Sequence, residues 1–126
     1  MNLIIIDLKS RAPIYEQIIN SVKEQIMKGF LVPDEALPSV RSLASELAIN
    51  PNTIQKAYTE LDRQGITYSV PGKGCFVASD REKIAEQFEA EYRKKLSALL
   101  SDGKNLGICK RAVTNLIDEI WGDTID

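Results

Sequence analysis

Side chains suited to contacting a nucleic-acid duplex follow the dipeptide Asn50-Pro51. Amides, hydroxyls and a cation lie close together there, at Asn52, Thr53, Gln55 and Lys56. Amide and basic side chains match the donors and acceptors of base edges in the major groove, and cations attract phosphates. This spacing therefore suggests a surface for double-stranded DNA. The alternative is an ordinary solvated helix face, since most surface helices carry a polar side.

Residue types needed for catalysis or metal binding are scarce. The chain has no histidine, so no side chain has an unperturbed pKa near 7. Its two cysteines, Cys75 and Cys109, are 34 positions apart, whereas zinc sites need clustered thiolates and imidazoles. No nucleophile–base pair or carboxylate dyad stands out. We therefore expect no enzyme, no metal and no cofactor, and reduced cysteines rather than a disulfide.

The size and composition fit a small globular protein. The chain has 126 residues, of which 44% are hydrophobic and 27% charged, as in typical folded domains. Its longest aliphatic run, Leu3–Ile6, has four residues. A membrane span needs about 20 and a signal-peptide core at least about 7. We expect neither, and hence a soluble cytoplasmic protein.

The charge balance is unusual for a nucleic-acid-binding protein. Lysine and arginine number 16, and aspartate and glutamate 18, for a net charge of −2. Residues 1–79 carry eight basic and eight acidic side chains, and residues 80–126 carry eight and ten. Because nucleic-acid binders are usually basic, DNA binding here must depend on the local placement of cations.

A first amphipathic helix is predicted over about residues 13–28. Gly29 follows its last apolar residue, where a residue with positive φ commonly ends a helix. Apolar residues recur every four positions and form one stripe: Ile14, Ile18, Val22 and Ile26.

Two shorter helices follow and outline a helix-turn-helix at about residues 39–58. Ser39 suits the N-cap of the first, because its hydroxyl can accept a bond from an otherwise unpaired backbone N–H. The second begins at Asn50-Pro51, a capping side chain before a proline at the first helical position, and ends at Gly65. An angular count of about 100° per residue places its polar side chains opposite its apolar ones. The outward side holds Asn52, Lys56, Thr59 and Arg63.

The apolar period then changes to two, which predicts a β-hairpin at about residues 66–78. At its tip Lys73 stands between Gly72 and Gly74. A phosphate-binding P-loop is a poor interpretation, because a strand follows instead of a helix. We interpret the hairpin as a wing whose glycines let backbone N–H groups approach a phosphate while Lys73 adds charge. A solvated turn is the alternative.

Residues 80–126 are predicted to form two amphipathic helices, with a break that begins at Asp102-Gly103. So short a helical hairpin cannot bury enough apolar surface to fold alone. We expect it to form a homodimer, the commonest symmetric assembly. Packing against the chain's own N-terminal domain is the alternative. The side chains expected at the dimer interface are Phe88, Tyr92, Leu96, Leu99, Val113, Leu116 and Ile120.

The stretch Leu37–Ala44 resembles the LPSxRxLA signature of the GntR family of bacterial transcription regulators. The similarity continues through Asn50–Ile54 and the hairpin Gly72–Val77, and covers about residues 11–79. Ala48 stands where the family usually has the glycine of the turn. The short two-helix tail resembles the YtrA subfamily, whose members are typically homodimeric repressors. The resemblance implies a mainly α-helical fold with a small β-hairpin wing.

The same resemblance implies roles for individual residues. Arg41 matches an arginine that contacts the DNA backbone or a base near the groove edge, and Lys73 matches the wing that enters the minor groove. Asn50-Pro51 replaces a frequent Ser-Arg pair. The residues that we expect to contact DNA are Ser39, Arg41, Asn50, Asn52, Thr53, Gln55, Lys56, Gly72, Lys73 and Gly74.

The sequence thus predicts a DNA-binding winged helix-turn-helix domain in residues 1–79 and a dimerisation region in residues 80–126. The expected function is a transcriptional regulator, a homodimeric repressor on a palindromic operator, with control by a small-molecule effector left open. No membrane partner is expected. A winged-helix module that binds proteins instead of DNA is the competing class, and the neutral charge is its best support.

Overall fold

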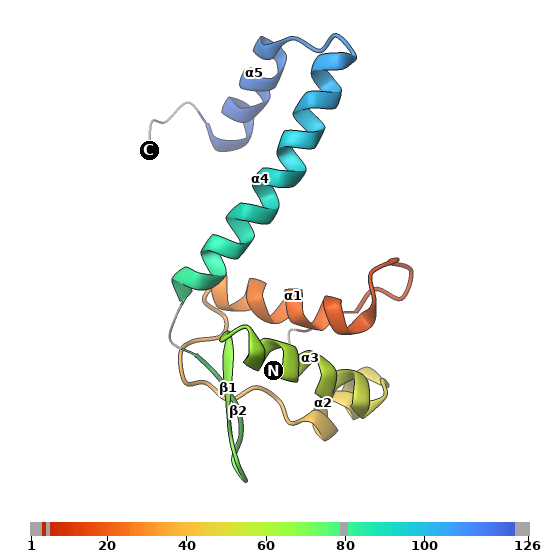
Figure 1. Ribbon diagram of the computed structural model, residues 1–126, viewed down its shortest axis with the longest axis vertical. Coiled ribbons are helices and arrows are strands. Elements are labelled where there is room, and N and C mark those ends of the chain that lie inside the picture. Colours follow the sequence, from red (N-terminus) through yellow and green to blue (C-terminus); the bar gives the residue numbers. More distant parts are fainter. Residues whose placement is uncertain (1–3, 5, 79–80, 123–126) are drawn as a thin grey trace. The chain divides into compact units, whose positions relative to one another are not determined.

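The computed structural model describes residue 4 and residues 6–78 and 81–122, which contain five helices and one two-stranded sheet (Figure 1). Compactness divides the chain into two units, Met1–Glu86 and Gln87–Asp126. The mainly helical fold with a single antiparallel hairpin confirms the predicted fold class.

Three helices form the body of the first unit: α1 (Ile14–Met27), α2 (Val40–Leu47) and α3 (Pro51–Arg63). Both α1 and α2 pack on α3, which makes α3 the central helix (Figure 1). The apolar stripes predicted from periodicity face inward. Fully buried side chains of these helices include Ile18, Val22, Leu43, Ile54 and Leu61.

Capping side chains begin α2 and α3 where the sequence predicts. Ser39 Oγ accepts a hydrogen bond from the Ser42 N–H at 3.0 Å, and Asn50 Oδ1 accepts one from the Asn52 N–H at 2.9 Å. Each bond satisfies a backbone donor that lacks a partner within the helix. In α1, by contrast, Pro13 is the cap residue and makes no side-chain hydrogen bond.

Left-handed residues end all three helices. Gly29 follows α1 with a φ of +80° and Gly65 follows α3 with a φ of +76°. Ala48 holds the same position after α2 with a φ of +53°, although it carries a Cβ atom. At each end the N–H of the following residue bonds to a carbonyl five residues earlier, at 2.9–3.0 Å. This is the Schellman arrangement, which glycine adopts most readily.

The predicted hairpin consists of β1 (Thr67–Val70) and β2 (Gly74–Val77). At its tip the Lys73 N–H donates to the Val70 carbonyl at 2.9 Å, and Gly72 has a φ of +76°. These values describe a type II turn with proline at its second position and glycine at its third. The turn displays Lys73 at the end of the hairpin.

The connector before α2 pairs with the outer edge of β2. The Leu37 N–H donates to the Cys75 carbonyl at 2.8 Å, and the Val77 N–H donates to the Glu35 carbonyl at 2.9 Å. The sequence analysis did not anticipate this pairing. It joins the hairpin to the start of the helix-turn-helix.

The long helix α4 (Arg81–Asn105) begins in the first unit, where Ile84 is buried and Arg81 donates to the Met27 carbonyl. It continues through Asp102-Gly103, so the break predicted there is wrong. One glycine costs a helix about 1 kcal/mol, which need not end it. The helix ends instead at Asn105, and Gly107 follows with a φ of +87° and a bond from the Ile108 N–H to the Gly103 carbonyl at 2.9 Å.

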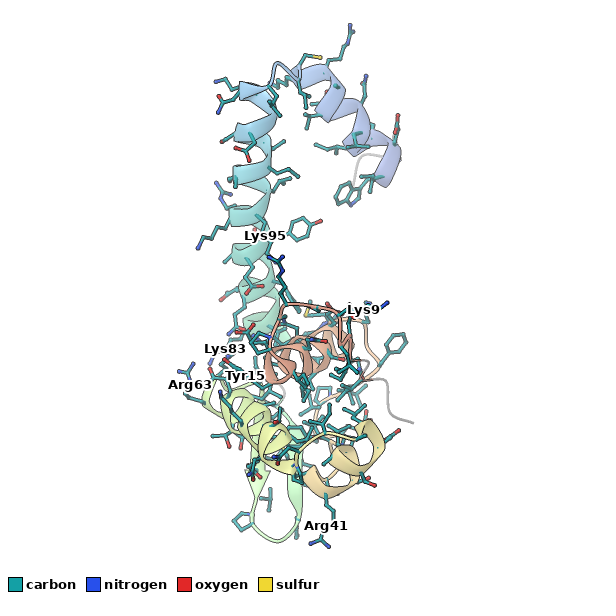
Figure 2. The ribbon with its side chains drawn as sticks, turned by 90° about the vertical axis from the view of Figure 1, so that its right-hand side faces the viewer. Lys9, Tyr15, Arg41, Arg63, Lys83 and Lys95 are labelled. Atoms are coloured by element: carbon teal, nitrogen blue, oxygen red, sulfur yellow. The ribbon has the colours of Figure 1, made fainter. Side chains whose placement is uncertain are left out.

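The second unit leaves much apolar surface uncovered. Its two helices, the remainder of α4 and α5 (Lys110–Trp121), diverge from their loop (Figure 2). Phe88 and Val113 are half-buried. The other five side chains expected at a dimer interface are exposed, and we call them the C-terminal apolar face: Tyr92, Leu96, Leu99, Leu116 and Ile120.

Candidate nucleic-acid interface

The N-terminal half of α3 presents the amides that the sequence singles out. Asn52 and Gln55 are exposed and Thr53 is half-buried, while Ile54 is buried on the opposite side. Gln55 Nε2 donates to Thr59 Oγ1 at 3.2 Å, one turn along the helix. Among the described residues the Asn52 side chain has no hydrogen-bond partner. The amides of this half of α3 are therefore available to an external partner.

Two of the predicted DNA-contacting residues, Ser39 and Asn50, also serve as helix caps. The oxygens of Ser39 and Asn50 accept backbone hydrogen bonds, so each is engaged in starting a helix. The Ser39 hydroxyl hydrogen and the Asn50 amide hydrogens remain able to donate. Both residues are exposed. Each can therefore hold its helix and donate to a phosphate or a base acceptor at the same time.

Both cations of α3 interact with side chains of the same unit. Lys56 Nζ lies 3.9 Å from the centre of the Tyr15 ring of α1, a cation–π contact. Arg63 Nε donates to Glu60 Oε2 at 2.8 Å, and a second bond from its guanidinium completes an ion pair. Hydrogen bonds from Arg63 and Gln64 lower the pKa of Glu60 to about 2. The angular count placed both cations outward, yet neither projects without a partner.

Arg41 and Lys73 are the predicted contact residues whose cations project from the unit. Both are exposed, and neither has a recorded partner among the described residues. Arg41 extends from α2 on the side toward which the hairpin points (Figure 2). Gly72 and Gly74, which flank Lys73, have open space where a side chain would begin. The hairpin tip therefore offers both a charge and an accessible backbone.

A tyrosine fixes α2 against α3. The Tyr58 hydroxyl donates to the Pro38 carbonyl at 2.7 Å, one residue before the Ser39 cap. Burial is the main cause that raises the pKa of Tyr58 far above its usual value. The sequence analysis placed Tyr58 in the core but did not identify this bond, which links residues far apart in the chain.

Asp62 connects α3 to the hairpin, and the sequence analysis missed it. Its carboxylate accepts hydrogen bonds from the hydroxyls of Thr67 and Ser69 and from the thiol of Cys75. Burial raises the pKa of the Cys75 thiol, which therefore stays protonated as a donor. The alternation of Thr67 and Ser69 is a sequence signal for one shared face, but it does not name the acceptor.

The described residues contain no cluster of three or more side chains able to hold a metal ion. No helix in the same residues has the length and apolar composition needed to cross a membrane.

Comparison with known proteins identifies the family of this chain. The profile described as "Bacterial regulatory proteins, gntR family" matches residues 14–77, from the start of α1 to the end of β2. The chain belongs to the GntR family. The match covers every element that carries the predicted DNA contacts, including both cations that project, Arg41 and Lys73.

The similarity to whole GntR regulators extends into the second unit. The HTH-type transcriptional repressor YtrA of Bacillus subtilis (strain 168) is 38% identical over 122 residues, covering 96% of this chain and 94% of YtrA. A GntR family transcriptional regulator from Listeria monocytogenes is similar in structure, with a TM-score of 0.72, 36% identity, and 90% and 98% of the two chains covered. The two-helix tail is therefore shared with YtrA-like proteins.

A solved complex shows what a domain of this kind binds. AraR(DBD), determined in complex with operator ORX1, is similar to this chain with a TM-score of 0.53 and 33% identity. The similarity covers 59% of this chain and 92% of AraR(DBD). This GntR protein is a DNA-binding transcriptional regulator and not an enzyme.

Proposed function

We propose that this regulator binds a two-fold symmetric operator as a homodimer and represses transcription by occupying it. The observation that carries the proposal is the exposed amide surface of α3 in the same unit as two unpartnered cations, Arg41 and Lys73. The relative YtrA is a repressor. A cytoplasmic location, where the DNA lies, is part of the proposal.

Each group of side chains has its own task in this proposal. Asn52, Thr53 and Gln55 contact base edges in the major groove, and asparagine and glutamine pair best with adenine. Arg41 and Lys73 neutralise phosphates and hold the register on the duplex. Contacts from Ser39, Asn50, Lys56, Gly72 and Gly74 are further parts of the same predicted interface. For Lys56 the contact requires its ammonium to leave the Tyr15 ring.

The even charge of residues 1–79 is compatible with DNA binding because two cations are placed to meet phosphates, while several acids bond to other groups of the protein. Glu60 pairs with Arg63, Asp62 accepts from the hairpin, and Asp34 accepts from the Tyr68 hydroxyl at 2.7 Å. The cations Arg41 and Lys73 have no such partners in the described residues. The attraction to phosphates therefore depends on the local placement of Arg41 and Lys73 and not on the net charge.

The C-terminal apolar face supports the homodimer. Tyr92 and Leu99 are 69% and 68% exposed, and Ile120 is 67% exposed. Soluble proteins rarely leave large contiguous apolar patches in water, so such a face marks an interaction site. A second copy of the chain brings the same face and closes a two-fold interface. The two copies of α3, which we call the recognition helices, then meet successive major grooves of one duplex.

Substitutions separate phosphate contacts from base contacts. In a dimer, Arg41→Ala removes two phosphate contacts, so the slope of log affinity against log salt falls by about 1.8, at about 0.9 for each contact. Asn52→Ala relaxes the preference at one base pair of each half-site instead, where a good bidentate contact discriminates by about 1–3 kcal/mol. Fluorescence anisotropy with operator and scrambled duplexes at several salt concentrations measures both effects.

Lys95→Ala is the charge-matched control, because Lys95 is an exposed cation of the second unit (Figure 2). It should leave the salt slope within about 0.3 of the parent. If Arg41→Ala and Asn52→Ala also behave like the parent, the proposed contact residues are wrong. If the parent itself binds no duplex, the protein-binding module is the better interpretation. Control by a small effector remains a hypothesis, tested by titrating metabolites into the protein–operator complex.

A further inference from the structure

Asp62 is a carboxylate of the recognition helix that takes no part in the contacts proposed with DNA. It lies in the last turn of α3, where the helix dipole disfavours negative charge. Its side chain accepts hydrogen bonds from the Thr67 hydroxyl, from the Ser69 hydroxyl at 2.5 Å and from the Cys75 thiol at 3.6 Å. All three donors belong to the hairpin.

The three donors share one face of the hairpin. Thr67 and Ser69 are two positions apart on β1, and Cys75 lies opposite Ser69 on β2. Thr67 and Cys75 are buried, with exposed fractions of 3% and 8%. Because one carboxylate bonds to both strands, it restricts rotation of the hairpin relative to α3. A buried polar group left without its partner is destabilising, so the two buried donors, Thr67 and Cys75, favour this one arrangement.

We propose that Asp62 is the positioning residue of the wing. It fixes the hairpin against the recognition helix so that Lys73 reaches the phosphate backbone while Asn52 and Gln55 lie in the major groove. This inference rests on the proposed function, in which the wing contacts DNA. Asp62 acts through the hairpin and does not touch DNA.

Charge alone predicts the opposite effect of removing Asp62. A DNA-binding protein that loses a carboxylate repels phosphates less and binds more tightly. Loss of the wing position predicts weaker binding. Glu60→Ala is the matched control, because it removes the same charge from the same helix, and Glu60 bonds to Arg63 and Gln64 instead of the hairpin.

The decisive experiment is a double-mutant cycle with Lys73, read by anisotropy on a duplex selected from a random pool. Asp62→Ala is expected to weaken binding about three- to tenfold, no more than Lys73→Ala does. The double variant should bind within about twofold of Lys73→Ala, because a displaced wing has already lost its contact. Glu60→Ala should bind as tightly as the parent or more tightly. Additive losses, or parental binding by Asp62→Ala, would overturn the inference.

Hydrogen exchange tests the same role without DNA. Asp62→Ala should accelerate exchange of backbone amides in Thr67–Val77 while Ile14–Met27 keeps its protection. Asp62→Asn, which keeps one carbonyl acceptor, should give a smaller acceleration. Unchanged exchange in the hairpin overturns the positioning role. If Lys73→Ala itself binds like the parent, the wing contact of the proposed function is wrong, and the exchange result alone decides the role of Asp62.

Discussion

Ala48→Gly should stabilise the protein, because Ala48 holds a backbone conformation that favours glycine. Its φ of +53° ends α2 at the turn of the helix-turn-helix. A left-handed conformation costs an L-residue about 1–2 kcal/mol. Glycine removes that cost but adds about 0.4–1 kcal/mol of chain entropy to the unfolded state. The net gain in the free energy of unfolding is therefore about 0.5–1 kcal/mol.

Gly29→Ala is the reverse substitution at the matching position after α1. Gly29 has a φ of +80°, and a Cβ added there meets no heavy atom within 4 Å. The change therefore tests backbone strain without a steric clash. It should lower the free energy of unfolding by about 0.5–1 kcal/mol, opposite in sign to Ala48→Gly.

Thermal unfolding followed by far-ultraviolet circular dichroism measures both variants. In a domain of 60–100 residues, 1 kcal/mol shifts Tm by about 4–8 °C, so each variant should move it by about 2–8 °C. All samples need one chain concentration, because a dimer makes Tm concentration-dependent. If both variants shift Tm in the same direction, or Ala48→Gly lowers it, the account of strain at this turn is refuted.

Two other predictions concern Tyr58 and the C-terminal apolar face. Because the pKa of Tyr58 is raised in the folded protein, its neutral form stabilises the fold fully below pH 10 and less as the pH rises above 10. Tyr58→Phe should therefore lower the free energy of unfolding by about 1 kcal/mol at pH 8. This deficit should shrink toward pH 12, as measured by urea unfolding. A deficit that stays constant with pH would contradict this relation between the pKa of Tyr58 and stability. Leu99→Asp should shift the mass measured by light scattering from dimer to monomer, whereas Lys95→Ala should not. A Leu99→Asp dimer would place the interface elsewhere.

Local sequence patterns, which depend on residues close together in the chain, predicted most of the fold. Ser39 and Asn50 begin helices because a cap bonds to a backbone group only two or three residues away. The stripe of α1 and the hairpin followed from periodicity for the same reason. The prediction failed at Gly103, because a glycine in a helix is a small cost that the rest of the helix outweighs.

The sequence predicted which residues belong to the candidate site, but not which side chains they contact within the protein. The sequence indicated that Lys56 lies on the polar side of α3, yet its contact with Tyr15 depends on how α1 packs. In the sequence Asp62 resembles an ordinary surface acid, whereas in the structure its carboxylate bonds to the hairpin. Pairing of the connector with β2 is likewise a contact between distant segments. Such contacts depend on tertiary packing, which no local pattern specifies.

Selection of bound duplexes from a random pool tests the central claim most directly. A homodimer with one recognition helix in each half-site should enrich a palindromic consensus. Its half-sites should lie about 10–10.5 base pairs apart, or a multiple of that distance. An asymmetric consensus with one half-site, or no enrichment over the starting pool, would contradict the account.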